Sequence, residues 1–226
     1  MTWRRGELFA DRAAAGRVLA ERLSREPSVT ALAPDTVPQR VAVLGLARGG
    51  VPVARPVADA LGAPLDALVV RKIGAPGQPE FAMGAIAAGE IIVNDDIPRR
   101  LGVSDKDFQA IVDRENEIRM EREARYRAGR PAIALGGRLA ILVDDGLATG
   151  STMAVAIRAV RAAGAGSVIV AAPTAPSDVL ARFRSDPAVT AVVVVSTPEP
   201  FHAVGQSYED FRQVDDDEVR RCLGST

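Results

Sequence analysis

Short apolar runs rich in valine and isoleucine recur along the chain and alternate with alanine-rich stretches whose apolar positions repeat at helical spacing. This alternation is typical of a parallel sheet covered by helices on both faces. Five runs are long enough for buried strands: "VAVLGLA" (41–47), "DALVVRK" (66–72), "RLAILVD" (138–144), "SVIVAAP" (167–173) and "TAVVVVS" (190–196). The pattern predicts an α/β fold with a doubly wound, mainly parallel five-stranded sheet.

Helices are predicted around and between these strands. Residues 51–62 and 151–165 have the spacing of crossover helices, and Gly164 is placed to end the second one. Residues 11–25 form an N-terminal helix with apolar side chains on one side. The segment 26–39 contains three prolines and is interpreted as a linker into the first strand.

The segment 104–127 departs from this alternation of strands and helices because it is long and highly charged. Ser104 is a candidate N-cap, with Asp107 three residues later. A sparse apolar stripe runs along the helix through Phe108, Ile111, Val112, Ile118 and Tyr126. The favoured interpretation is a solvated helix laid over the sheet, and a contact between subunits is the alternative.

Composition limits the classes of function. With 226 residues, of which 47% are hydrophobic, the chain can bury one sizeable core. Its 28 basic and 29 acidic residues give a net charge of −1, so neither nucleic acid nor a membrane surface is expected as a partner. The start of the chain lacks the apolar core of a signal peptide, and no apolar run approaches the roughly 20 residues of a membrane helix.

Cysteine and histidine are each present once, as Cys222 and His202. A single cysteine excludes an intramolecular disulfide and fits a reducing compartment, so we expect a cytoplasmic protein. A single histidine excludes a Cys/His zinc cluster and argues against a Ser-His-Asp mechanism. Any enzymatic chemistry would then use carboxylates, backbone amides, cations or a bound metal ion.

The most informative segment is "ILVDDGLATGST" (141–152). A buried strand ends in Asp144 and Asp145, and a loop of small residues then opens a helix, which places backbone N–H groups at the carboxyl edge of the sheet. Glycines in the loop allow a close approach to the backbone, and its hydroxyl groups add donors, so the loop suits a phosphate. The two acids must face something else, either a sugar's hydroxyl groups or a divalent cation. Together they indicate a sugar phosphate.

Other phosphate motifs fit poorly. A nucleoside-triphosphate loop needs a lysine, and none follows Lys106. "GLARGG" (45–50) has the wrong glycine spacing for a dinucleotide fingerprint. A receiver-type phosphoacceptor would have its acid pair near the first strand. An ordinary strand-to-helix turn with an acidic cap remains the alternative.

The segment 141–152 resembles the signature loop of the type I phosphoribosyltransferases, which bind 5-phosphoribosyl 1-pyrophosphate and magnesium. The resemblance implies that Asp144 and Asp145 contact the ribose hydroxyls, and that they meet Mg²⁺ only indirectly, through those hydroxyls or water. It also implies that the turn formed by Ala148, Thr149, Gly150, Ser151 and Thr152 binds the 5′-phosphate.

The same resemblance assigns further residues. Arg48, Gly49 and Gly50 follow the first strand, where the family holds pyrophosphate, and Arg48 is also a candidate catalytic residue. Arg71 and Lys72 match an Arg-Lys pair that some members place near pyrophosphate, and both are candidate catalytic residues. A lid hairpin over 74–89 would close over the reacting centre.

One departure and one variable region limit what the resemblance implies about the acceptor. Several purine-type members have an aspartate where this chain has Ala148, so no general base is assigned. The acceptor is recognised in the family by a small hood built from the chain ends, here about 1–25 and 197–226 around a core of about 40–196. Phe201, Val204 and Tyr208 are the candidate acceptor residues, and packing is the alternative for the aromatic pair.

The sequence therefore predicts a single domain over 1–226 that transfers a phosphoribosyl group to a nitrogenous acceptor, with a nucleobase as the favoured class. A homodimer is possible. Two alternatives remain open: a regulator that senses phosphoribosyl pyrophosphate or a nucleotide, and a hydrolase that uses water as the acceptor.

Overall fold

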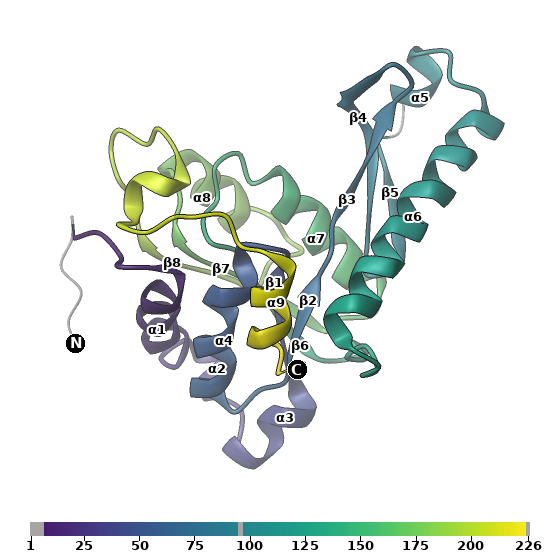
Figure 1. The fold of residues 1–226 in the computed structure, drawn as a ribbon. Coiled ribbons are helices and arrows are strands. Elements are labelled where there is room, and N and C mark those ends of the chain that lie inside the picture. The colour runs from purple at the N-terminus through teal and green to yellow at the C-terminus, as the bar shows by residue number, and fades with distance from the viewer. Residues whose placement is uncertain (1–6, 95–96, 225–226) are drawn as a thin grey trace.

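The computed structural model describes residues 7–94 and 97–224, and its centre is a five-stranded sheet (Figure 1). All five strands are parallel and lie in the order β2-β1-β6-β7-β8. They are β1 (Val41–Leu46), β2 (Leu65–Leu68), β6 (Leu139–Val143), β7 (Ser167–Thr174) and β8 (Ala191–Ser196). The predicted five-stranded parallel sheet is confirmed.

Helices cover both faces of this sheet, as predicted (Figure 1). Because successive strand residues point to opposite faces, Val41 and Val43 join one core, and Ala42 and Leu44 join the other. The first core is completed by α1 (Arg12–Leu23), α4 (Gly50–Leu61) and α9 (Asp216–Cys222). The second is completed by α7 (Ser151–Ala162) and α8 (Ser177–Arg184).

The prediction of one continuous strand over 66–72 is wrong. Strand β2 ends at Leu68, and Arg71 begins β3 (Arg71–Ala75), which belongs to a second, antiparallel sheet with β4 (Gln78–Ala87) and β5 (Glu90–Val93). Val69 and Val70 continue the apolar run between them without any turn residue, so the pattern gave no sign of the change of sheet. The predicted lid hairpin is therefore part of a three-stranded sheet.

This second sheet has a small core of its own. Ile73, Met83 and Ile86 are fully buried, together with Val112 from α6 (Asp105–Arg127). The sheet rises beyond the main sheet, and α6 lies along it (Figure 1). The base of the predicted lid is thus packed, and Gly77 forms its turn with a φ of +70°.

Helix α6 begins where predicted, but its buried face is not the predicted apolar stripe. The Ser104 hydroxyl accepts a hydrogen bond from the Asp107 amide at 3.1 Å, which confirms the N-cap. Val112 and Tyr126 are buried, whereas Phe108, Ile111 and Ile118 are only partly buried. Helix α6 lies along the second sheet with its outer side exposed, as the interpretation of a solvated helix expects, but charged side chains fill the rest of its buried face.

Ion pairs account for that buried charge. Arg119 donates to Glu123 at 2.7 Å, and Arg127 donates to Glu123 at 3.0 Å and to Asp66 on strand β2 at 2.9 Å. Buried charges of this kind need partners, and here the partners tie α6 to the edge of the main sheet. The hydropathy of the sequence could not reveal this buried face of α6, because the residues buried there include charged side chains.

The predicted linker 26–39 is not extended. It contains α2 (Pro27–Thr30), the 3-10 turn η1 (Pro34–Thr36) and α3 (Val37–Arg40), each with proline in its first turn, where the missing N–H group costs nothing. Two further short elements, α5 (Ile97–Arg100) and η2 (Val204–Ser207), also lacked a sequence signal.

The two chain ends lie together. The Phe9 amide donates to the Ser207 carbonyl at 2.8 Å, and the Glu209 amide donates to the Phe9 carbonyl at 2.8 Å. The hood predicted over about 1–25 and 197–226 stays a prediction, and its residues 1–6 and 225–226 lie outside the described residues.

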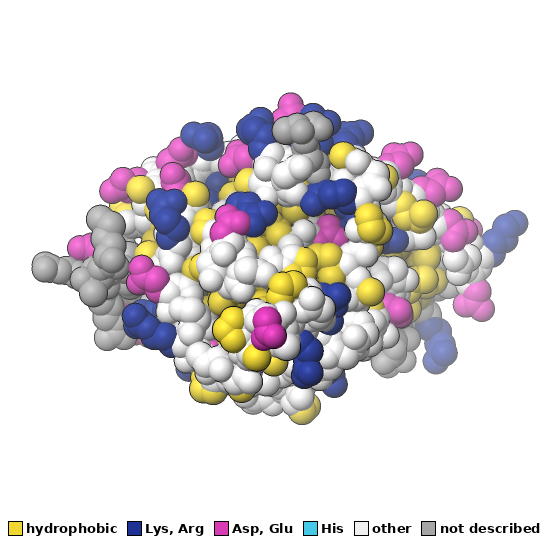
Figure 2. All heavy atoms as spheres, turned by 90° about the horizontal axis from the view of Figure 1, so that it is seen from below, with side chains coloured by type: hydrophobic (Ala, Val, Ile, Leu, Met, Phe, Trp, Pro, Cys, Tyr) yellow, Lys and Arg dark blue, Asp and Glu magenta, His cyan; other side chains and the backbone are white. Residues whose placement is uncertain are grey.

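The face of the molecule shown in Figure 2 matches the near-neutral composition. On the face turned toward the viewer in Figure 2, basic and acidic side chains are interspersed and neither sign forms a continuous block. Within the described ranges, none of the helices combines the length and the apolar character needed to cross a membrane.

Helix α9 is fixed to α6 through one carboxylate. The Tyr126 hydroxyl donates to Asp216 at 2.8 Å and Arg125 donates to it at 3.2 Å. The Tyr126 hydrogen bond, assisted by Arg125, lowers the pKa of Asp216 below its ordinary value despite partial desolvation. The ionised carboxylate therefore stabilises the folded state.

We predict that Asp216→Asn lowers the free energy of unfolding at neutral pH. A carboxyl group with a lowered folded-state pKa contributes stability above its unfolded pKa of about 3.9 and loses it as the pH falls through the folded value. The difference from the wild type should therefore shrink below about pH 4, measured by urea unfolding at pH 7 and pH 3. Asp217→Asn, at an exposed neighbour paired only along the helix with Arg220, is the control. An equal difference at both pH values would contradict the prediction.

Candidate functional site

The loop between β6 and α7 surrounds a small hollow at the carboxyl edge of the main sheet. Asp144 and residues 146–153 line a cavity of about 140 Å³. Helix α7 begins after Gly150, which has no side chain to cap the first amides. The Thr149 hydroxyl lies 3.1 Å from the Ser151 hydroxyl. The Ser151 amide donates to the Thr149 hydroxyl at 3.3 Å, so the groups that can bind an anion in this hollow are the remaining first-turn amides of α7 and the hydroxyl groups.

The shape of this loop is fixed from outside it. Gly150 has a φ of +68°, and a Cβ there would lie 2.7 Å from both Arg182 and the Phe183 ring. Arg182 donates to the Thr149 carbonyl at 2.6 Å, and the Leu147 amide donates to the Thr174 carbonyl at 2.9 Å. The predicted phosphate turn, from Ala148 to Thr152, is therefore held open by α8 and β7.

The two acids that precede the turn lie in a desolvated position. Burial, followed by the charge of Asp145, raises the pKa of Asp144 well above its ordinary value. Burial also raises the pKa of Asp145, and the Arg12 guanidinium acts against that shift. Arg12 Nε donates to Asp145 Oδ2 at 2.9 Å, and Arg12 Nη2 forms an ion pair with the same oxygen at 2.8 Å. Two acceptor groups are thus placed side by side next to the hollow.

The glycine loop after β1 lies directly against this acid pair. A Cβ on Gly49 would collide with the Asp145 carboxylate, and a Cβ on Gly50 would collide with the Val143 carbonyl oxygen. Only glycine permits this approach. Arg48 precedes the pair after a cis peptide bond, and its Nη1 lies 3.8 Å from Asp216 Oδ1. The two loops identified in the sequence therefore form one continuous surface.

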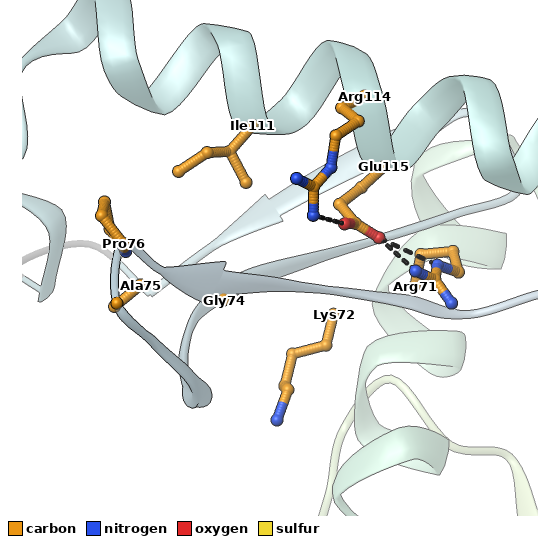
Figure 3. Close-up of a pocket in the computed structure, with 9 residues that line it drawn as sticks. Arg71, Lys72, Gly74, Ala75, Pro76, Ile111, Arg114 and Glu115 are labelled. Carbon is orange, nitrogen blue, oxygen red and sulfur yellow. Dashed lines mark hydrogen bonds and ion pairs between the residues drawn. The ribbon is translucent and has the colours of Figure 1, made fainter.

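Arg71 and Lys72 do not act as a side-by-side pair. They lie on β3, where adjacent residues point to opposite faces, and Figure 3 shows the two side chains diverging. Arg71 donates from Nε to Glu115 of α6 at 3.0 Å, and Arg114 donates to the other Glu115 oxygen at 3.2 Å. These residues border a cavity of about 640 Å³ between the turn of the second sheet and α6.

The side chain of Lys72 points away from Arg71 and Glu115 (Figure 3). Besides bordering the same 640 Å³ cavity as Arg71, it lines a second cavity of about 360 Å³ together with Ser151 and Thr152, at the start of α7. Of the two predicted residues, Lys72 is therefore the one that shares a cavity with the phosphate turn.

The three predicted acceptor residues occupy different environments. Val204 packs so closely over Gly146 that a Cβ on that glycine would collide with it. Tyr208 is buried, its ring lies between Phe9 and Phe211 at centroid distances of 5.5 Å and 5.0 Å, and its hydroxyl donates to the Asp145 carbonyl. Tyr208 thus supports the loop from behind. Phe201 is half-buried earlier in the same hood segment.

Four residues at or behind this site were not predicted: Arg12, Glu115, Arg182 and Asp216. Each acts through a partner far away in the sequence, and each lies in a charged helical turn that resembles an ordinary solvated surface. No local signal distinguishes them.

Over residues 7–94 and 97–224, no three histidine, cysteine, aspartate or glutamate side chains are grouped so that they could hold a metal ion. The oxygen donors at the site are the two adjacent carboxylates, one of them bound to Arg12. Such a donor set fits Mg²⁺, which keeps several waters and is bound through one or two carboxylates together with substrate phosphates.

Known proteins resemble this chain in sequence and in fold. Residues 21–182 match the model of the phosphoribosyl transferase domain family. Two Mycobacterium tuberculosis proteins, each named "Putative phosphoribosyl transferase", are 47% identical to the chain over 214 residues, which is 94% of this chain and 46% of each relative. The chain thus spans about half the length of these relatives.

A solved structure is similar over nearly its whole length. The crystal structure of TT1426 from Thermus thermophilus is 40% identical, with a TM-score of 0.76 over 96% of this chain and 97% of that one. The sequence motif, the five-stranded fold and these matches agree, and the chain belongs to the phosphoribosyl transferase family.

Proposed function

We propose that the chain transfers the 5-phosphoribosyl group of phosphoribosyl pyrophosphate to a nitrogenous acceptor, with release of pyrophosphate. The observation that carries the proposal is the contact between Gly49 and the Asp145 carboxylate. It joins a candidate pyrophosphate loop to a candidate ribose-phosphate loop at one edge of the sheet, so a single donor molecule can span both.

The 5′-phosphate would occupy the hollow formed by residues 148–152. Its charge would be met by the first-turn amides of α7 and by the hydroxyl groups of Thr149, Ser151 and Thr152. The ribose hydroxyls would donate to Asp144 and Asp145, whose carboxylates have lost water through burial and gain from new donors.

Pyrophosphate would lie along Arg48, Gly49 and Gly50. Negative charge grows on this group as the bond to the ribose C1 breaks, and fixed cations and amides stabilise that charge. Lys72 borders the phosphate turn and could contribute directly. Arg71 would reach the pyrophosphate either after breaking its hydrogen bond to Glu115 or while still bonded to Glu115. No covalent nucleophile on the protein is required.

Mg²⁺ would accompany the donor, held by its phosphate and ribose oxygens, with Asp144 and Asp145 acting through those hydroxyls or water. When bound, the ion neutralises charge on the pyrophosphate. The turn of the second sheet, within 74–89, would act as the lid that keeps water from the reacting centre.

The acceptor would enter beside the hood, near Val204 and Phe201, with Tyr208 supporting the loop from beneath. A planar nucleobase would pack on the half-buried Phe201 ring. Ala148 offers no general base, so deprotonation of the acceptor is not assigned to the loop. Cytoplasmic location, homodimer formation and the absence of a nucleic-acid partner stay predictions from the sequence.

Binding and turnover can be separated experimentally. We expect calorimetry to show binding of phosphoribosyl pyrophosphate in the presence of Mg²⁺, and a screen of nucleobases to identify one that triggers pyrophosphate release. Release without any base would indicate a hydrolase. Binding with no release from any acceptor would instead support a sensor, and no binding at all would refute the proposal.

We predict that Arg48→Ala lowers the rate of transfer on the order of a hundredfold, because one preorganised donor to the leaving group is lost. The measurement is the single-turnover rate of pyrophosphate release at saturating donor. Arg40→Ala is the matched control, since Arg40 is an exposed arginine just before β1, at the opposite end of the strand from Arg48. An unchanged rate in Arg48→Ala would exclude a role for this side chain in the transition state.

A further inference from the structure

Arg12 lies on the first turn of α1, in the hood, yet its guanidinium reaches the end of β6. It is 9% exposed, and all three of its nitrogens are engaged. Nε donates to Asp145 Oδ2 at 2.9 Å, Nη2 forms an ion pair with the same oxygen at 2.8 Å, and Nη1 donates to the Arg212 carbonyl at 2.8 Å. The guanidinium also stacks 4.0 Å from the centre of the Phe211 ring. Together these contacts leave it one orientation.

Asp145 is held equally firmly from its other sides. Its backbone carbonyl accepts the Tyr208 hydroxyl, and Gly49 closes against its carboxylate. Both Arg12 contacts fall on Oδ2, so the ion pair does not consume the second carboxylate oxygen. The carboxylate is thus oriented before any ligand arrives, with its second oxygen outside the ion pair.

We propose that Arg12 is a positioning residue for the donor site, which fixes the Asp145 carboxylate toward the ribose so that helix α1 of the hood sets the affinity for the sugar phosphate. The inference rests on the proposed function and deepens it. Preorganisation lowers the cost of ordering the site on binding. The position of Arg12 also gives the N-terminal helix α1 a role in donor binding, in addition to its packing on α4.

The chemistry of the contact favours arginine specifically. A planar guanidinium can donate to a carboxylate and to a carbonyl while stacking on a ring, whereas a lysine ammonium is a compact charge without that fork. Arg12→Lys would keep the charge near Asp145 but lose the orientation. Arg12→Met would remove both and leave Asp145 without its cation.

The test is calorimetry with phosphoribosyl pyrophosphate and Mg²⁺ on variants whose thermal unfolding shows them to be folded. Arg12→Met should raise the Kd on the order of tenfold to a hundredfold, because charge-assisted hydrogen bonds that orient an acceptor are lost. Arg12→Lys should give a smaller increase. Arg22→Met, on the same helix and bonded to the Val194 carbonyl at 3.1 Å, should stay within about twofold of the wild type.

A double-mutant cycle shows whether Arg12 acts through Asp145. In an Asp145→Asn background, Arg12→Met should weaken binding by much less than it does in the wild type. The full effect persisting in that background, or an equal loss in Arg22→Met, would overturn the inference in favour of a general structural role. If Arg12→Met does not fold, Arg12→Lys carries the test, and an unchanged Kd in it would overturn the inference.

The two proposals fail in different ways. Absence of binding by the wild type would refute the proposed function, and the positioning role with it. Binding by the wild type with an unchanged Kd in the Arg12 variants would overturn the positioning role alone.

Discussion

The adjacent carboxylates of Asp144 and Asp145 are buried at the end of β6, and contacts from the surrounding structure compensate for the hydration that they lose on folding. Burial raises the pKa of both, and the charge of Asp145 raises that of Asp144 further. A buried carboxylate without a partner is costly, so a cation must lie close by. Arg12 supplies it from α1. The position of the N-terminal helix and the charge of the site are therefore linked.

The same arrangement recurs at the other charged residues of the candidate site. Arg71 is bonded to Glu115 of α6, and Arg48 lies near Asp216 of α9. Like Arg12, these partners come from helices outside the main sheet, and they hold long flexible side chains near one edge. Fixing such side chains in advance removes part of the entropy that ligand binding would otherwise cost. The peripheral helices thus shape the site as well as the core.

The sequence predicted those features that are local in the chain, such as the strands and the consecutive acids, glycines and hydroxyls of 144–152. The contact of Gly49 with Asp145 joins distant segments, so no short pattern contains it. The run 66–72 was assigned to one strand because two valines bridge β2 and β3. The buried face of α6 was missed because its charges are hidden through pairing, which hydropathy cannot register. Arg12 was missed because its partner, Asp145, lies 133 positions away in the sequence.

The most direct test of the account is a crystal structure of the wild-type chain with phosphoribosyl pyrophosphate and Mg²⁺. We expect the 5′-phosphate within the turn 148–152, the ribose hydroxyls on Asp144 and Asp145, and the pyrophosphate beside Gly49 and Gly50. The sugar phosphate bound elsewhere, with the acid pair contacting only Arg12 and water, would contradict the central claim that these two loops form one donor site.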